Sequence, residues 1–242
     1  TKINAEAIFP YQIYQEMAKD LYQAKMKQAI IAQWNALPNY MEGSTQRIIP
    51  VCDTSGSMTG IPMDVSISLG LYISERNKSV FKDAFITFSA VPNFQYLKGD
   101  LYNRCRQLAA SGHGMNTNLE AVFQVLLKKA VEHQVPAEDM PTKILIISDM
   151  EFDMAVSCNQ TAIKMINHHY LQAGYQVPGV NFWNVKGRIG NVPARADAKN
   201  VALVSGFSPS ILKSVLAGAE GFTPKSIMMD TILNERYQAI QL

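Results

Sequence analysis

The chain has 242 residues, of which 48% are hydrophobic and 17% are charged, and its formal net charge is +2. This composition predicts a folded domain with its own core, and the small net charge argues against a strongly basic nucleic-acid module. No apolar run approaches the ~18–20 residues of a membrane span and no signal-peptide pattern opens the chain, so we expect no membrane association. The three cysteines, Cys52, Cys105 and Cys158, are odd in number and widely spaced, which predicts reduced thiols and a cytoplasmic location.

Residues 1–45 differ from the rest of the chain and predict a helical extension. Apolar residues recur four apart in Pro10–Ala24, and a second helix-compatible stretch covers Lys25–Leu37. A loop with Gly and Ser follows. We expect this extension to be the remnant of a larger N-terminal part, with the main domain over residues 46–242.

From residue 46 onward, short apolar runs alternate with stretches of helical periodicity. We expect strands at Arg47–Asp53, Asp83–Phe88, Asn93–Leu97, Lys143–Asp149, Gly179–Val185 and Asn200–Val204. We expect helices at Pro62–Glu75, Leu101–Ala109, Leu119–Val131, Thr161–Ala173, Ser208–Gly218 and Thr223–Ile240. This alternation predicts an α/β fold with a doubly wound, mostly parallel sheet of about six strands flanked by helices, similar to a Rossmann fold. Pro50 is unusual for the central strand in which it lies.

Three loops place oxygen-bearing side chains at one end of this sheet. Asp53-Thr54-Ser55-Gly56-Ser57 follows the first strand, Gly114–Asn118 precedes the helix at 119, and Ser148-Asp149 ends the central apolar strand. Ligands of such sheets bind beyond the carboxyl ends of the strands. Two carboxylates and three hydroxyls suit Mg²⁺, with Mn²⁺ or Ca²⁺ as alternatives. Taken singly, each loop also has an ordinary reading as a turn or a helix cap.

The order of these residues resembles the metal-ion-dependent adhesion site of von Willebrand factor A domains. That motif is D-x-S-x-S followed by a distant Thr and a distant Asp, and it is matched by Asp53, Ser55, Ser57, Thr117 and Asp149. The chain is most similar to a poorly characterised family related to the A domain of the Ro RNA-binding autoantigen. The stretches that carry this resemblance are PVCDTSGSM (50–58), GMNTN (114–118), ISDMEFD (147–153) and VALVSGFSPSILK (201–213).

The resemblance implies a binding module rather than an enzyme. Ser55, Ser57 and Thr117 would contact a divalent ion, and Asp53 and Asp149 would act largely through bound water. One coordination position would remain for a carboxylate from a protein or ribonucleoprotein partner. The loop GHGMNTN before the helix at 119 differs from that of adhesion receptors.

Two other functions compete with this reading. A Mg²⁺ phosphohydrolase of the haloacid-dehalogenase type also begins with a strand ending in Asp, but it needs an acid two residues later, where this chain has Ser55. An RNA-associated role by analogy with Ro is disfavoured, because RNA contact in those proteins belongs largely to a helical-repeat portion that this chain lacks. Residues 186–199 carry four cations, including Lys186, and this cluster predicts either a phosphate contact or a solvated loop. No aromatic residues that could stack on bases lie between these cations, which favours the solvated loop.

Overall fold

The structure, a computed structural model, describes residues 8–21, 23–111, 118–150, 160–186, 201–206, 208–217 and 229. Its helices are α1 (Pro10–Asp20), α2 (Lys27–Asn35), α3 (Ile61–Arg76), α4 (Leu101–Ala109), α5 (Leu119–Glu132), α6 (Gln160–Gln172) and α7 (Pro209–Ala217), with short 3-10 helices η1 (Gly56–Met58) and η2 (Ala137–Asp139). Its strands are β1 (Ile48–Cys52), β2 (Ala84–Thr87), β3 (Phe94–Tyr96), β4 (Lys143–Ser148), β5 (Gly179–Asn184) and β6 (Val201–Ser205).

The strands form one six-stranded sheet in the order β3-β2-β1-β4-β5-β6. Every neighbouring pair is parallel except β2 and β3, which form an antiparallel hairpin. This arrangement confirms the α/β fold with a mostly parallel sheet flanked by helices. The chain builds the sheet outward from β1 on one side and then from β4 on the other, so the strand order reverses between these two strands. Such a switch point is where open α/β sheets bind their ligands.

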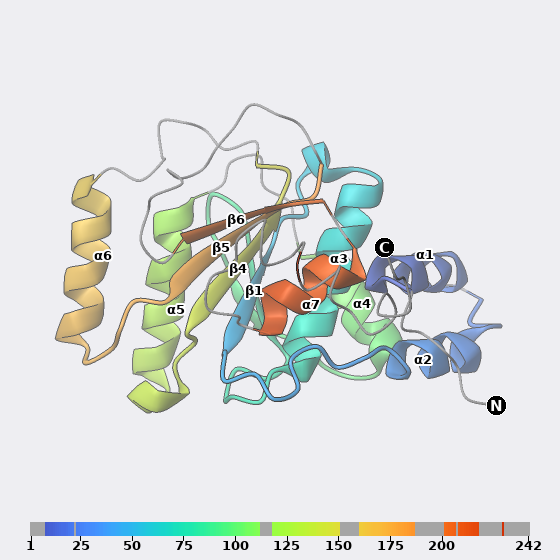
Figure 1. Cartoon of the computed structure of the whole chain (residues 1–242), viewed down its shortest axis with the longest axis horizontal. Helices are drawn as coiled ribbons and strands as arrows, with labels where there is room; N and C mark the ends of the chain where they lie inside the picture. Colours follow the sequence, from blue (N-terminus) through green and yellow to red (C-terminus); the bar gives the residue numbers. More distant parts are fainter. Residues whose placement is uncertain are drawn as a thin grey trace, which may run out of the picture.

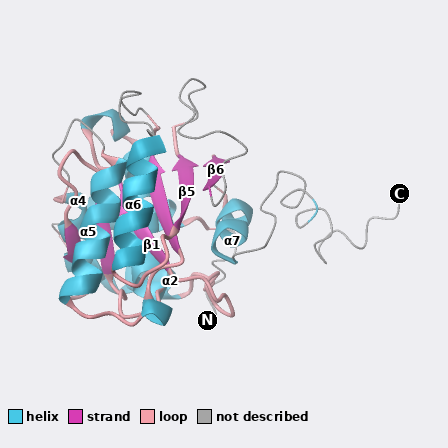
Figure 2. Ribbon diagram, turned by 90° about the vertical axis from the view of Figure 1, so that its left-hand side faces the viewer, coloured by secondary structure: helices cyan, strands magenta, loops and turns pink. Residues whose placement is uncertain are grey.

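Helices cover both faces of the sheet, because its central strands are apolar on both sides. In β1, Ile49 and Val51 join the core beneath α5 and α6, whereas Ile48 and Cys52 join the core beneath α3, α4 and α7. Figure 1 shows the sheet between these two groups of helices, and Figure 2 shows α5 and α6 in front of the strands. This double coverage explains why the strand sequences read as continuous apolar runs.

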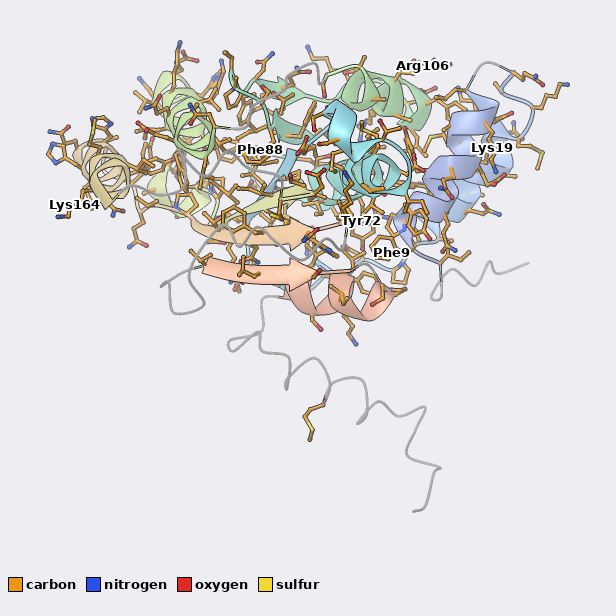
Figure 3. All side chains as sticks on the ribbon, turned by 90° about the horizontal axis from the view of Figure 1, so that it is seen from above. Phe9, Lys19, Tyr72, Phe88, Arg106 and Lys164 are labelled. Carbon is orange, nitrogen blue, oxygen red and sulfur yellow. The ribbon has the colours of Figure 1, made fainter. Side chains whose placement is uncertain are left out.

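Helices α1 and α2 pack onto α3 and extend the same core. Met17 and Trp34 are fully buried in the cluster that also contains the apolar residues of α3. The indole Nε1 of Trp34 donates a 2.8 Å hydrogen bond to Glu75, and Gln15 Nε2 donates one of 2.8 Å to Asp64. Both acceptors lie on α3. The two N-terminal helices therefore share a core with the sheet; Figure 3 shows that Lys19 on α1 and Lys164 on α6 mark opposite ends of the molecule.

Pro50, which has no N–H to donate, fits into the central strand because it faces β2 at a point where the pairing with β2 has not yet begun. Asp53 N donates to Ile147 O of β4, at 3.0 Å. Alternate residues of a parallel strand face the same neighbour, so Pro50 faces β2 rather than β4. The register with β2 begins only at Val51, and the proline therefore lies just before the first pair of that ladder.

The observed elements lie close to the predicted ranges. The helix predicted at Leu101–Ala109 has those bounds, and the first predicted strand is shortened to Ile48–Cys52, which leaves Asp53 in the following loop. The helix predicted for residues 223–240 falls outside the described residues except for Met229. None of the described helices has the length and apolar character needed to cross a membrane.

Candidate functional site

Asp53 and Asp149 lie at the switch point of the sheet. Each residue directly follows one of the two central strands, Asp53 after β1 and Asp149 after β4. The strands run parallel with Cys52 opposite Ile147, so their carboxyl ends meet at one edge. Both aspartates are buried, with 1% and 3% of their surface exposed. The predicted convergence of these two residues is therefore present in the structure.

The carboxylate of Asp53 is held by two hydrogen bonds from its surroundings. Its Oδ1 accepts from the backbone N–H of Ser55, at 3.0 Å, and its Oδ2 accepts from Ser148 Oγ, at 2.6 Å. Ser148 Oγ in turn accepts from the backbone N–H of Met150, at 3.2 Å. These contacts fix the carboxylate between the loop after β1 and the end of β4.

Two serine hydroxyls lie next to each other on the same loop. The Oγ atoms of Ser55 and Ser57 are 3.0 Å apart. Neighbouring ligands of an octahedral ion with bonds of about 2.1 Å are also about 3.0 Å apart. Ser57 is exposed and Ser55 is half-buried, so the hydroxyls face solvent while the carboxylates lie beneath. The loop thus places the carboxylate of Asp53 inside and the two serine hydroxyls toward the surface.

The electrostatics of Asp53 are those of a carboxyl group withdrawn from water. Burial raises its pKa above the ordinary value, and the nearby negative charge of Asp149 raises it further. The hydrogen bonds from Ser148 and Ser55 act in the opposite direction but do not outweigh burial. A cation bound at this position would stabilise the charged form of Asp53.

Lys186 also reaches this site, and the sequence reasoning did not place it there. Its Nζ lies 3.1 Å from Asp149 Oδ2 and 2.7 Å from the backbone oxygen of Ser57. Only 21% of its side chain is exposed, so the prediction of a solvated loop is wrong for this residue. The strand order could have indicated this position, because Lys186 lies two residues beyond β5 and β5 is the neighbour of β4, which Asp149 directly follows. The other cations of 186–199 lie outside the described residues.

Thr117, the fifth predicted ligand, lies outside the described residues. Its neighbour Asn118 is described and caps α5, with its side chain accepting from the backbone N–H of Ala121 at 3.1 Å. The backbone N–H of Asn118 donates to Ser89 O in the loop after β2, at 3.3 Å. The start of α5 is thereby tied to a loop at the same end of the sheet, while the role of Thr117 stays a prediction.

The methionines of the two described loops belong to the core. Met58 has 0% and Met150 has 2% of its surface exposed. Both side chains belong to the core clusters, so they fill the core and do not form an apolar rim for a ligand. Met115, in the remaining loop, lies outside the described residues.

The chemistry of the donor set fits a hard divalent ion bound partly through neutral oxygens. The described residues contain no group of three or more His, Cys, Asp or Glu side chains able to hold a metal. An ion here would therefore need the serine hydroxyls in addition to the two carboxylates, a set typical of Mg²⁺. Thr54 Oγ1, in the same loop, is buried and makes no hydrogen bond within the described part of the chain. A buried hydroxyl without a hydrogen bond lowers the stability of the fold, so this hydroxyl is available to bond a further group at the loop.

Comparison with known proteins assigns the chain to a family. Residues 47–238 match the family described as "Domain of unknown function (DUF7788)". This match covers most of the chain, and the chain belongs to this family. The predicted kinship with a poorly characterised family is thereby confirmed, whereas the metal-ion-dependent adhesion site stays a prediction.

Individual proteins that are similar to the chain include the following two. "Uncharacterized protein L728" of Acanthamoeba polyphaga mimivirus is 27% identical over 238 residues, which cover 96% of this chain and 41% of that protein. The chain thus spans less than half the length of this relative. The crystal structure of the Deinococcus radiodurans RO (RSR) protein matches with a TM-score of 0.49 and 15% identity, over 80% of this chain and 38% of that one.

Proposed function

We propose that this domain is a divalent-metal-dependent binding module. The ion, Mg²⁺ or a similar hard cation, would be held by Asp53, Ser55, Ser57 and Asp149, with Thr117 as the further ligand expected from the sequence. One coordination position would accept a carboxylate from a protein or ribonucleoprotein partner. The observation that carries the proposal is the pair of serine hydroxyls, 3.0 Å apart, beside two buried carboxylates at the switch point of the sheet.

The charge of the site supports an external acidic ligand. Two carboxylates balance the charge of a divalent ion on their own, but Lys186, which lies beside Asp149 here, adds a positive charge that stays near the site even when its ammonium group moves away from Asp149. The described part of the site would then carry a surplus positive charge once an ion is present, which favours an incoming anion. The hydroxyl-bearing side of the loop is the exposed one, so an anion can approach the ion from solvent.

The same geometry supports binding over phosphoryl transfer. A dehalogenase-type phosphohydrolase needs a second acid two residues after its nucleophile to protonate the leaving oxygen. Here that position is Ser55, whose hydroxyl lies against Ser57. A serine hydroxyl is far too weak an acid for this proton transfer. We therefore propose that the domain is not an enzyme.

Calorimetric titration with Mn²⁺ and thermal unfolding with Mg²⁺ or chelator test the proposal. At ten times the dissociation constant, ligand binding to the folded state adds about 1.4 kcal/mol to the free energy of unfolding, or roughly 3–6 °C in Tm for a domain of this size. Asp53→Asn should abolish this increase. Asp64→Asn is the matched control, because it makes the same chemical change at a carboxylate on α3 that bonds Gln15 and is not a proposed ligand. Equal metal-induced shifts in wild type and Asp53→Asn would place the ion elsewhere and refute the proposal.

A further inference from the structure

The backbone around Lys186 directs its side chain toward the candidate metal site. Val185, directly before it, is buried, and its N–H donates to Ser148 O at the end of β4, at 3.1 Å. The N–H of Lys186 itself donates to Asn184 Oδ1, at 3.0 Å. The first bond fastens the chain beyond β5 to the last residue of β4, and the second fastens it to the last residue of β5. The backbone hydrogen bonds of the fold thus fix where the Lys186 side chain begins, and its ammonium group is directed toward the site.

The ammonium group binds the same kinds of atoms that a metal ion would use. It lies 3.1 Å from Asp149 Oδ2 and 2.7 Å from Ser57 O. Asp149 belongs to the predicted ligand set, and Ser57 O is the carbonyl of a predicted ligand. With only 2% of the Asp149 side chain exposed, water screens this pair weakly. Removing a partner from such a buried pair leaves an uncompensated charge.

We propose that Lys186 is a tethered competitor of the divalent ion and sets the affinity of the site. This inference rests on the proposed metal-dependent function. The ion needs Asp149, which Lys186 occupies, and a divalent ion and an ammonium at the same carboxylate repel each other. Ion binding therefore requires the Lys186 Nζ to leave Asp149. The apparent affinity of the site for the metal is therefore its intrinsic affinity multiplied by the fraction of molecules in which the lysine has left Asp149.

The test compares Mn²⁺ affinities of the wild-type chain, Lys186→Gln and the control Lys164→Gln. Glutamine keeps a polar side chain but removes the charge, and Lys164 is an exposed lysine on α6. Titration calorimetry should give Lys186→Gln an apparent affinity at least about tenfold higher than wild type, as expected when a competing state is removed. Lys164→Gln should match wild type. In chelator, Lys186→Gln should melt below wild type, and Mn²⁺ should raise its Tm by more than it raises that of wild type.

The outcomes separate this inference from the proposed function. Equal affinities in wild type and Lys186→Gln, both measurable, overturn the competitor role and leave the metal-binding function standing. Binding by Lys186→Gln alone supports the competitor role and contradicts metal binding by the native chain. Absence of binding in both proteins overturns both ideas. If Lys186→Gln fails to fold, a crystal structure of wild type with Mn²⁺ decides, because Lys186 Nζ must then lie outside hydrogen-bond distance of Asp149.

Discussion

Ser148 Oγ lies 2.6 Å from Asp53 Oδ2, and this bond joins the last residue of β4 to the first residue beyond β1. Because Ser148 Oγ also accepts from the N–H of Met150, its hydroxyl proton is directed at the carboxylate. Asp53 is thus oriented by the sheet itself. A group that orients a ligand in this way usually matters to a site nearly as much as the ligand.

Ser148→Ala should therefore weaken metal binding without removing a ligand. Loss of an orienting partner typically lowers metal affinity by about 10–100-fold, and loss of the hydrogen bond also favours the neutral form of Asp53. Mn²⁺ titration of both proteins measures the change. Ser66→Ala is the matched control, since Ser66 is also a buried serine whose hydroxyl is directed at β4, at Ile147 O. Equal losses in the two variants would show that general damage to the core is responsible.

The raised pKa of Asp53 predicts a pH dependence of the metal-free protein. Between the ordinary value, about 4, and the raised value in the folded state, the folded protein binds more protons than the unfolded chain. The contribution of Asp53 to the free energy of unfolding therefore falls as pH rises through this window. Asp53→Asn lacks this titration, so it should gain stability relative to wild type as pH increases from about 4 toward neutrality. Urea unfolding in chelator at several pH values measures this difference, and a difference independent of pH would contradict the assignment.

Trp34→Ala tests whether the N-terminal helices share a core with the sheet. The side chain is fully buried and its indole is bonded to Glu75 of α3. Truncation of a buried tryptophan costs about 3–5 kcal/mol, whereas Met26→Ala, at a position that is 59% exposed, should change the stability by less than about 0.5 kcal/mol. Urea unfolding of the whole chain gives both values. A cost below about 1 kcal/mol for Trp34→Ala would mean that α1 and α2 are only loosely attached.

Gly70→Ala should destabilise the chain despite the helix preference of alanine. A Cβ at Gly70 would overlap Cys52 Sγ and lie 2.9 Å from Leu108 Cδ1. Overpacking of this kind costs about 1–3 kcal/mol, more than the roughly 1 kcal/mol gained by replacing Gly in a helix. Adding Cys52→Ala should restore part of the loss, because it removes one of the two overlapping atoms. Strictly additive effects in the double variant would show that the Cys52 contact is not the cause.

The order of strands and helices could be predicted from the sequence because each element carries its own local signal. Apolar runs such as Lys143–Asp149 indicate buried parallel strands, and Ser208-Pro209 indicates the start of α7, where Ser208 Oγ accepts from Ile211 N. The convergence of Asp53 and Asp149 followed from the same reasoning, since both residues end parallel strands. Local sequence signals were sufficient for these features.

Lys186 could not be predicted in the same way, because its role depends on which strands are neighbours. The sequence around Lys186 contains further cations and reads as a solvated loop, and only the pairing of β5 with β4 brings its side chain to Asp149. The bond between Trp34 and Glu75 is a second example, since it joins residues 41 apart in the chain. Such contacts arise from tertiary packing, which no window of local sequence contains.

The two tryptophans of the chain make its intrinsic fluorescence a report on two separate regions. Trp34 lies on α2, one of the two N-terminal helices. Trp183 lies on β5, where its indole N–H donates to Gly206 O, directly after β6. Both are fully buried. Single-tryptophan variants would therefore emit from either the N-terminal helices or the sheet, and the coincidence of their unfolding curves would measure how far the two regions melt as one cooperative unit.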